Sequence, residues 1–127
     1  MNLESLPTFA VIYVGDLQQM RRFYEECFGW SVIDDGHSYC GLRSHAGLVT
    51  LVETADARVE AGSAPRRSAT AIKLVVEVES IDDAITAVVA AGGRSDPADR
   101  AWKFRGTPHR DVIDPEGNVV QLVQTTA

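Results

Sequence analysis

The sequence predicts an α+β fold of two tandem strand–helix–three-strand (βαβββ) modules, whose curved mixed sheets surround a cavity. One pattern of strand and helix occurs twice, 64 residues apart, so that Phe9 corresponds to Lys73. Short apolar segments with turn residues between them follow each helix, as expected for strands. The length of 127 residues suits a single domain. We place module one at about residues 7–54, a linker at about 55–69 and module two at about 70–125.

The first copy of the pattern begins with an apolar, β-branched segment at residues 9–14, which is typical of a buried strand. Asp16 is a suitable N-cap because its carboxylate accepts hydrogen bonds from the free N–H groups of the next turn. Apolar residues follow at helical spacing, and Gly29 is suited to the left-handed conformation that ends helices. The sequence predicts further strands at residues 30–33, 39–42 and 47–52.

The second copy has its strand at residues 73–78 and its helix N-cap at Ser80, with Asp83 completing a pair that resembles a capping box. Gly92 and Gly93 end this helix. We expect an irregular, charged segment at residues 100–105. The remaining elements are short strands near 93–96 and 110–113, a tight turn at 114–118 and a last strand at 119–123. The segment 55–69 is rich in small residues, which is typical of a linker or mobile loop.

Composition and charge narrow the classes of function. The formal charge is −6 and basic residues form only short pairs, which argues against nucleic acid as a partner. No apolar segment approaches the roughly 20 residues that span a bilayer, so we expect no membrane partner. Cys27 and Cys40 form no CxxC motif and are predicted to be free thiols of a cytoplasmic protein. Cys27 lies on the apolar face of its helix, as a small buried hydrophobe does.

Two motifs resemble those of a known family. The sequence Val-Gly-Asp-Leu at 14–17, followed by Phe-Tyr at 23–24 and Phe-Gly at 28–29, resembles the first-module signature of glyoxalase/bleomycin-resistance/extradiol-dioxygenase (vicinal oxygen chelate) proteins. The sequence Asp-Pro-Glu-Gly-Asn at 114–118, followed by Val-Val-Gln-Leu-Val, resembles the signature that closes their second module. The resemblance extends from about residue 8 to 124 and implies a fold, not a reaction, because this fold hosts many chemistries.

The resemblance also implies where a metal would bind. Metal-using members carry four ligands, usually His, Glu or Gln, on the first and last strands of the two modules. The corresponding positions here are Phe9, Thr50, Lys73 and Gln121. Phe9 cannot ligate and Lys73 would bring a positive charge next to a cation, so we predict no metal and no cofactor. His37, Cys40, His45 and His109 are the alternative ligands, but they lack short metal-binding spacing.

Alternation along the strands predicts which side chains face the cavity. If position 9 faces it, positions 11 and 13 do as well, and the same holds for the neighbours of positions 50, 73 and 121. The predicted ligand-binding residues are Phe9, Tyr13, Thr50, Lys73, Glu77, Trp102, His109 and Gln121. A mostly apolar cavity with a few polar groups is typical of a small-molecule pocket.

Three of these residues have alternative interpretations. Lys73 is paired with Glu77 or another acid, has a lowered pKa, or awaits an anionic ligand; otherwise it reaches the cavity mouth and is solvated. Trp102 either stacks on a planar ligand at the rim or covers the core from outside. His109 lines the pocket as an acid or base, or has no such role. Trp30, in contrast, is predicted to lie in the core or an interface.

Three functional hypotheses follow. The first is a metal-free small-molecule-binding protein of the bleomycin-resistance type, with a drug or aromatic metabolite as ligand. The resemblance implies a homodimer, because drug-resistance members often share pockets between subunits. The second is a glyoxalase- or dioxygenase-like lyase or isomerase that uses a divalent metal with atypical ligands, or metal-free acid–base catalysis. The third is a scaffold whose pocket is a relic and whose role is a protein contact.

Overall fold

A computed structural model of the chain describes residues 6–59, 64–67 and 71–125. Module one folds into one four-stranded sheet with the order β1-β4-β3-β2 and one helix. The strand β1 runs parallel to β4, and the other two pairs are antiparallel. Its elements are β1 (Thr8–Val14), α1 (Leu17–Phe28), β2 (Ser31–Asp35), β3 (Tyr39–Ser44) and β4 (Gly47–Glu53).

Module two repeats this arrangement with the order β5-β9-β8-β6, and an extra strand, β7, pairs with β8. The parallel pair is again formed by the first and last strands, β5 and β9. Its elements are β5 (Leu74–Val78), α2 (Ile81–Ala90), β6 (Arg94–Ser95), β7 (Trp102–Phe104), β8 (Thr107–Ile113) and β9 (Val119–Gln124). The α+β class and the doubled βαβββ pattern are therefore confirmed.

The prediction of an irregular segment at residues 100–105 is wrong. Trp102 pairs with His109 and Phe104 with Thr107, so that β7 and β8 form a hairpin. Arg105 and Gly106 make the turn with φ angles of 54° and 76°. Positive φ at both central residues suits a tight hairpin, although Arg is an unusual residue there. The same pairing explains why β8 begins before residue 110, where its start was predicted.

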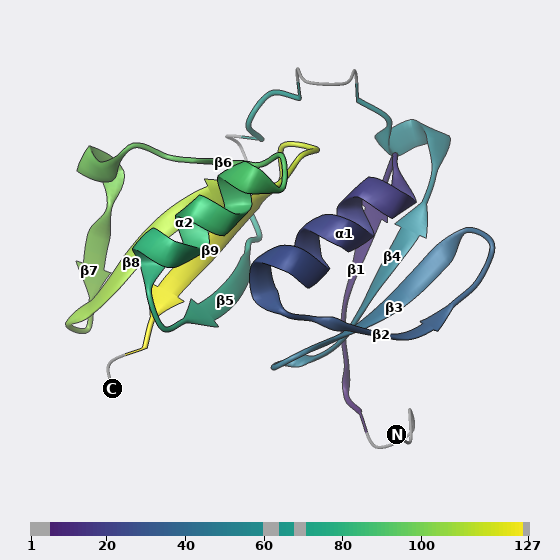
Figure 1. Cartoon of the computed structure of the whole chain (residues 1–127), viewed down its shortest axis with the longest axis horizontal. Helices are drawn as coiled ribbons and strands as arrows, with labels where there is room; N and C mark the ends of the chain where they lie inside the picture. Colours follow the sequence, from purple (N-terminus) through teal and green to yellow (C-terminus); the bar gives the residue numbers. More distant parts are fainter. Residues whose placement is uncertain (1–5, 60–63, 68–70, 126–127) are drawn as a thin grey trace.

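The two helices lie next to each other across the sheets, and the sheets do not close into a barrel (Figure 1). A single core of buried side chains from both modules fills the space between helices and strands. The largest fully buried side chains are those of Tyr24, Phe23, Met20, Leu42 and Leu51. Trp30 also lies in this core and stacks on Tyr24 at 4.9 Å between ring centroids. Neither α1 nor α2, the helices of the described residues, has the length and apolar character to cross a membrane.

Each helix is held at its start by the last strand of its own module. The predicted N-caps are confirmed, because Asp16 accepts from the N–H of Gln19 and Ser80 from that of Asp83. In addition, Glu53 at the end of β4 accepts from the N–H of Leu17 at 3.0 Å. Gln124 on β9 accepts in the same way from the N–H of Ile81, at 2.9 Å. The internal repeat therefore extends to the hydrogen bonds that satisfy the free donors of both helices.

The turn at residues 114–118 joins the two modules. Asp114 is buried and accepts a hydrogen bond from the Tyr24 hydroxyl of α1 at 2.8 Å. Glu116 is also buried, and its carboxylate accepts from the backbone N–H groups of Gly15 and Asp16. Burial raises the pKa of both carboxyl groups above their ordinary values. The predicted turn is thus confirmed, and it also docks module two onto the start of α1.

The predicted linker is only partly outside the modules. Its first residues form a short 3₁₀ helix, η2 (Ala55–Ala57), and a second one, η3 (Ala98–Arg100), precedes β7. Residues 60–63 and 68–70 lie outside the described residues. Residues 64–67 lie against module two, where the N–H of Arg67 donates to the carbonyl of Gly117 at 2.9 Å. This part of the predicted linker or mobile loop therefore contacts the turn at 114–118.

Candidate functional site

Strand pairing places the predicted cavity-facing residues on one face of each sheet. Val11 pairs with Thr50 and Tyr13 with Val52 in module one. Their neighbours Ala10 and Ile12 point the other way and pack on the core. In module two, Glu77 pairs with Val123, and the same face carries Val75, Gln121, Asp111 and His109 through the pairing of β5, β9 and β8. The strand faces therefore agree with the predicted alternation.

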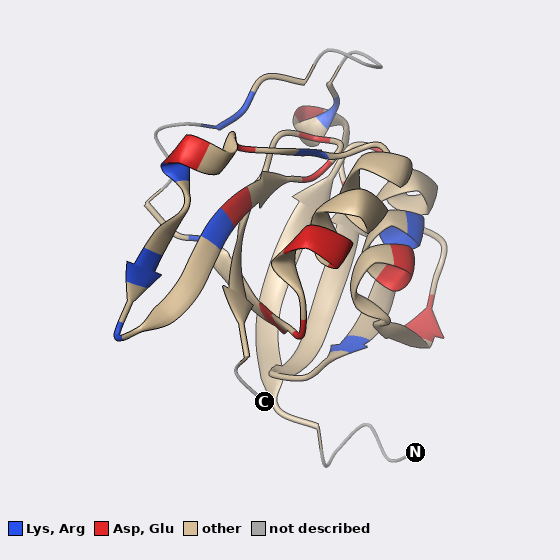
Figure 2. Cartoon of the chain, turned by 60° about the vertical axis from the view of Figure 1, so that its left-hand side comes forward, with Lys and Arg blue, Asp and Glu red and all other residues tan. Residues whose placement is uncertain are grey.

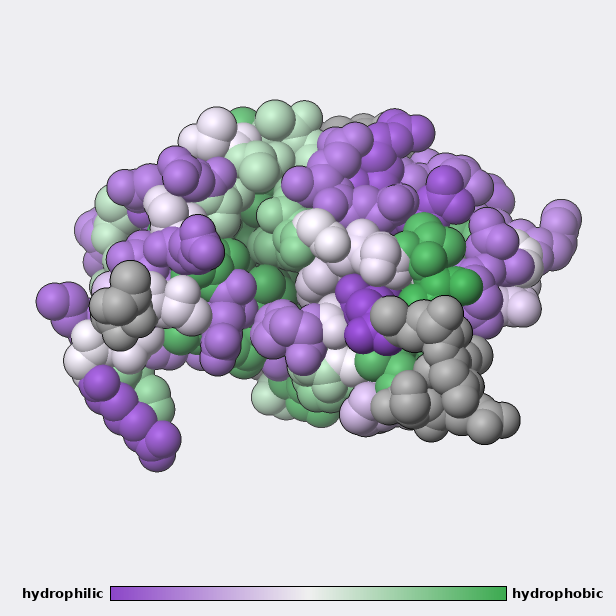
Figure 3. All heavy atoms as spheres, turned by 60° about the horizontal axis from the view of Figure 1, so that its bottom comes forward, coloured by the Kyte–Doolittle hydropathy of each residue, from purple (hydrophilic) through white to green (hydrophobic). Residues whose placement is uncertain are grey.

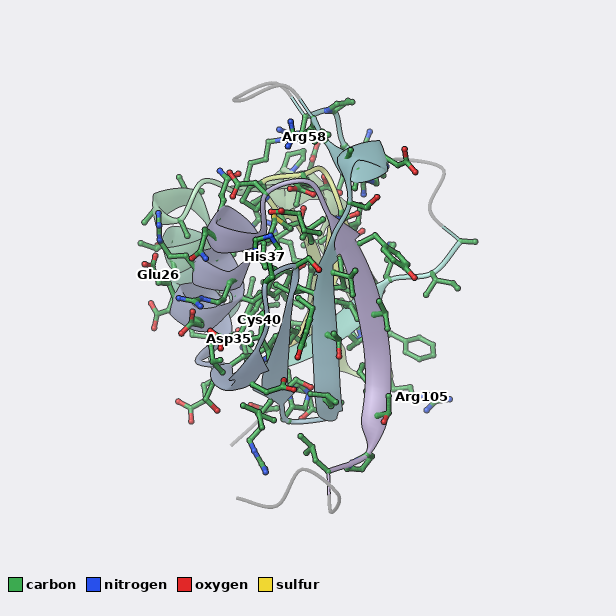
Figure 4. The ribbon with its side chains drawn as sticks, turned by 90° about the vertical axis from the view of Figure 1, so that its right-hand side faces the viewer. Glu26, Asp35, His37, Cys40, Arg58 and Arg105 are labelled. Atoms are coloured by element: carbon green, nitrogen blue, oxygen red, sulfur yellow. The ribbon has the colours of Figure 1, made fainter. Side chains whose placement is uncertain are left out.

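The open face of module one is apolar and exposed. Phe9, Val11 and Tyr13 follow one another on β1, with exposed fractions of 51%, 51% and 63%. Thr50 lies beside them and is half-buried. Figure 4 views this module from the side, with the helices on one side of the sheet and side chains projecting freely from the other. Exposed apolar side chains in a row of this kind make the face a candidate for contact with a ligand or a partner.

The corresponding face of module two is polar and centres on Asp111. This carboxylate is 5% exposed, and its Oδ2 accepts from Lys73 Nζ at 2.8 Å and from Arg66 at 3.3 Å. Arg66 is held by Asp96, which accepts from its Nε at 2.9 Å and from a terminal nitrogen at 2.8 Å. Figure 2 shows charged residues of both signs close together on the strands of this module. Two cations and two carboxylates thus form one network in which the charges balance.

This network decides between the interpretations of Lys73. The ammonium is paired with an acid, as one alternative predicted, but the acid is Asp111 and not Glu77. Its side chain is 32% exposed, so it is neither deeply buried nor fully solvated. Glu77 is exposed, two positions beyond Val75 along the same face of β5. Pairing with Asp111 is what an ammonium at a partly buried position requires.

Aromatic rings cover the outer part of this face. Trp102, which is 36% exposed, stacks on the buried imidazole of His109 at 5.3 Å between ring centroids. Lys73 Nζ lies 5.7 Å from the centre of the Trp102 ring, within the range of a cation–π interaction. His109 Nδ1 is 2.7 Å from the carbonyl oxygen of Thr107. Because a carbonyl only accepts, this contact fits the tautomer of the neutral ring that has its hydrogen on Nδ1 and its acceptor at Nε2.

The structure does not bring all eight predicted residues to one cavity. Tyr13 borders a cavity of about 310 Å³ between β1 and module two. Glu77 borders a groove of about 940 Å³ between the modules, at the end of the molecule that Figure 3 brings forward, where hydrophobic residues lie between hydrophilic ones. Trp102 and His109 border a third cavity of about 410 Å³. Phe9, Thr50, Lys73 and Gln121 border none of these three cavities.

The side chains at the four family ligand positions do not fit a metal ion. Phe9 has no donor atom, and Lys73 presents an ammonium already hydrogen-bonded to Asp111. Thr50 and Gln121 offer only neutral oxygens, which do not replace the missing imidazoles and carboxylates. The described residues contain no cluster of three or more His, Cys, Asp or Glu with metal-binding geometry. His37 and His45 are exposed residues of the loops between strands.

The two cysteines are free thiols in the part of the chain that the structure describes. Cys40 on β3 is buried in the core, and Cys27 on α1 is half-buried (Figure 4 labels Cys40). Burial raises the pKa of Cys27 to about 12, and also raises the pKa of Cys40. The Cys27 thiol donates to the carbonyl of Ala87 on α2, at 3.6 Å. Cys40 lies in the core and Cys27 packs against it, and a raised pKa disfavours the reactive thiolate in both.

Sequence reasoning missed Asp111, Arg66 and Asp96. Asp111 had a signal, because it lies two residues after His109 in a predicted strand and therefore shares its face. Arg66 and Asp96 had none. They lie in a linker and beside a two-residue strand, where no periodicity indicates direction.

Comparison with known proteins places the chain in a family. The model of the Glyoxalase/Bleomycin resistance protein/Dioxygenase superfamily matches residues 6–122. The chain belongs to this superfamily. The resemblance in the two motifs is thereby confirmed, and it covers both modules. No curated protein matches the chain significantly.

Solved structures of this superfamily share the fold. A glyoxalase/bleomycin resistance protein/dioxygenase family enzyme from Burkholderia phytofirmans is 18% identical, with a TM-score of 0.70 over 91% of this chain and 95% of that one. The fosfomycin resistance protein FosX from Listeria monocytogenes is 15% identical, with a TM-score of 0.71 over 95% and 91%. A glyoxalase-related enzyme from Fulvimarina pelagi is 22% identical, with a TM-score of 0.66 over 94% and 89%. At these identities the likeness concerns the fold.

Proposed function

We propose that this superfamily member binds a small molecule without a metal, in the manner of bleomycin-resistance proteins. The observation that carries the proposal is the Lys73–Asp111 ion pair. At a position where metal-using relatives place a ligand, this chain places an ammonium and supplies it with a buried carboxylate 2.8 Å away. An ammonium has no lone pair with which to ligate a metal ion, so this position does not supply a ligand.

The surroundings of Lys73 support an aromatic ligand, such as a drug or an aromatic metabolite. Trp102 offers a partly exposed ring beside the ammonium, and ring stacking favours planar molecules. The half-buried Gln121 adds a polar group on the same face. The ligand-binding roles of Phe9, Tyr13, Thr50, Glu77 and His109 remain part of this proposal.

We also propose that two copies of the chain pair and share the site. The exposed row Phe9, Val11 and Tyr13 supplies an apolar face, and module two supplies the polar face around Lys73. A second copy that covers the apolar row with the polar face of its own module two would enclose a pocket. One wall of this pocket would be apolar and the other polar. The free thiols support a reducing location, which we propose to be the cytoplasm.

Native mass spectrometry combined with elemental analysis tests this function. We expect a dimer without stoichiometric metal that retains or takes up an aromatic molecule. Lys73→Ala is expected to weaken ligand retention. Arg22→Ala is the matched control, since it removes an exposed positive charge from α1, away from the strands that carry the proposed site. One bound divalent ion per chain would contradict the proposal and favour an enzyme with atypical metal ligands.

One observation favours a second candidate, a metal-free lyase or isomerase. The buried His109 has its Nδ1 fixed on the Thr107 carbonyl, so that Nε2 is free to accept a proton beside Trp102. Incubation of the retained molecule with wild-type protein and with His109→Gln distinguishes the two functions. Conversion by the wild type that the substitution abolishes would establish catalysis. Recovery of the unchanged molecule from both proteins would leave binding as the function.

A further inference from the structure

Asp111 has one carboxylate oxygen that no group in the described residues satisfies. Its Oδ2 accepts from Lys73 and Arg66, but its Oδ1 is buried and has no hydrogen-bond partner. Nearly all buried polar atoms in folded proteins are hydrogen-bonded, so such an exception requires an explanation. An unpaired buried acceptor on the proposed ligand face indicates a ligand that brings a donor.

Gln121 is the residue directly opposite Asp111 in the pairing of β8 with β9. Side chains at opposite positions of antiparallel strands lie about 5 Å apart at Cβ and point the same way. The half-buried amide of Gln121 makes no hydrogen bond within the described residues. It therefore offers an unused donor next to the unused acceptor of Asp111. The two side chains therefore present a donor and an acceptor side by side on this face of β8 and β9.

The charge of the ligand follows from the ion pairs. Lys73 is neutralised by Asp111, and Asp96 holds Arg66 through two nitrogens. A strongly anionic ligand would have to compete with Asp111 for Lys73, and a cationic ligand would have to compete with Lys73 and Arg66 for Asp111. A neutral ligand leaves this network intact.

We propose that the site takes a neutral, planar cyclic amide or imide, and that Asp111 determines this specificity. The ligand N–H donates to Asp111 Oδ1, the adjacent carbonyl accepts from the Gln121 amide, and the ring lies against Trp102. Asp111 Oδ2 meanwhile holds Lys73. This inference rests on the proposed binding function. It makes Asp111 and Gln121 the residues that recognise the N–H and the adjacent carbonyl of the ligand.

The test uses two probes of the same shape and charge. Quinolin-2(1H)-one carries the N–H next to its carbonyl, and 1-methylquinolin-2-one has the same ring and carbonyl without the donor. Isothermal titration of the full-length protein is expected to show at least about ten-fold weaker binding of the methylated probe, because a buried acceptor then stays unpaired. Equal affinity would show that water satisfies Oδ1, and would overturn the inference. Failure of both probes to bind at millimolar concentration would overturn it as well.

The substitution Asp111→Asn tests the residue itself. Lys73 can only donate, so the new amide must turn its oxygen toward Lys73 and its NH₂ group into the place of Oδ1. A donor then replaces the acceptor, and we expect the preference for the N–H probe to disappear or to reverse. Asp96→Asn is the matched control, because it removes a carboxylate from the same network without touching the proposed edge. This control should keep the ten-fold preference.

Two measurements distinguish a variant that fails to fold from a wrong inference. Circular dichroism melting checks that Asp111→Asn folds, and the comparison of the two probes on the wild type does not depend on any variant. Loss of ligand retention in Lys73→Ala, together with equal binding of the two probes, would retain the binding function and refute the specificity. Metal in the wild-type protein would refute the binding function itself.

Discussion

The Tyr24 hydroxyl offers a direct measure of how strongly the two modules are coupled. Tyr24 lies on α1, and its hydroxyl donates to Asp114 of module two at 2.8 Å, with both side chains buried. A hydrogen bond to a charged group contributes about 1.5–3 kcal/mol. Asp114 Oδ2 keeps a second donor, Asn118 Nδ2 at 2.9 Å, so Tyr24→Phe should cost about 1.5–2 kcal/mol at neutral pH.

This loss would be measured as a free energy by urea unfolding, and thermal unfolding should show a fall in Tm of about 5–10 °C for a chain of this size. Tyr39→Phe serves as the control, because Tyr39 is 42% exposed and should stay within about 0.5 kcal/mol of the wild type. A Tyr24→Phe variant as stable as the wild type, or a control equally destabilised, would refute the reasoning that this bond couples the modules.

The pH dependence of the same variant has a definite sign. Burial raises the pKa of Asp114 above its ordinary value of 3.8, while the Tyr24 hydroxyl opposes this rise. The folded state therefore keeps the Asp114 proton at pH values where the unfolded chain has lost it, and stability falls as the pH rises through the folded pKa. Without the hydroxyl the folded pKa is higher, so stability falls further. The difference between wild type and variant should be largest at neutral pH and shrink toward acid; growth toward acid would contradict the assignment.

Three further predictions concern other parts of the molecule. Gly15→Ala should destabilise the protein by about 1–3 kcal/mol in thermal unfolding, because the new Cβ would lie 2.5 Å from the Cα of Arg58, and backbone cannot yield as a side chain can. The Cys27 thiol, whose pKa is raised to about 12, should react with a disulfide reagent at pH 8 far more slowly than a free thiol, and denaturant should abolish this protection. Tyr13→Asp should leave the melting of the monomer nearly unchanged but shift the mass in light scattering from dimer to monomer; a dimer that persists would exclude the β1 face from the interface.

The sequence determined the modules because their signals are local. Asp16 and Ser80 cap helices through donors three residues away, and alternation assigns a face to each strand from its own residues. The family resemblance supplied the positions of Lys73 and Gln121, and the same alternation then predicted which neighbouring side chains share their faces. The hairpin of β7 and β8 could not be predicted in this way, because its turn has Arg105 at positive φ. Glycine or asparagine usually occupies such a position and makes the turn recognisable in the sequence.

Only the tertiary structure decided which charges meet. Lys73 and Asp111 are 38 residues apart, Arg66 and Asp111 are 45 apart, and Glu116 reaches Gly15 across 101 residues. No periodicity connects such residues, since their contact depends on how strands and loops from different parts of the chain are placed. The prediction that a metal is unsuited to the family ligand positions could be made from the sequence, because it depends on the chemistry of single side chains. That an ion pair occupies this face, with one oxygen of Asp111 left open, follows from packing alone.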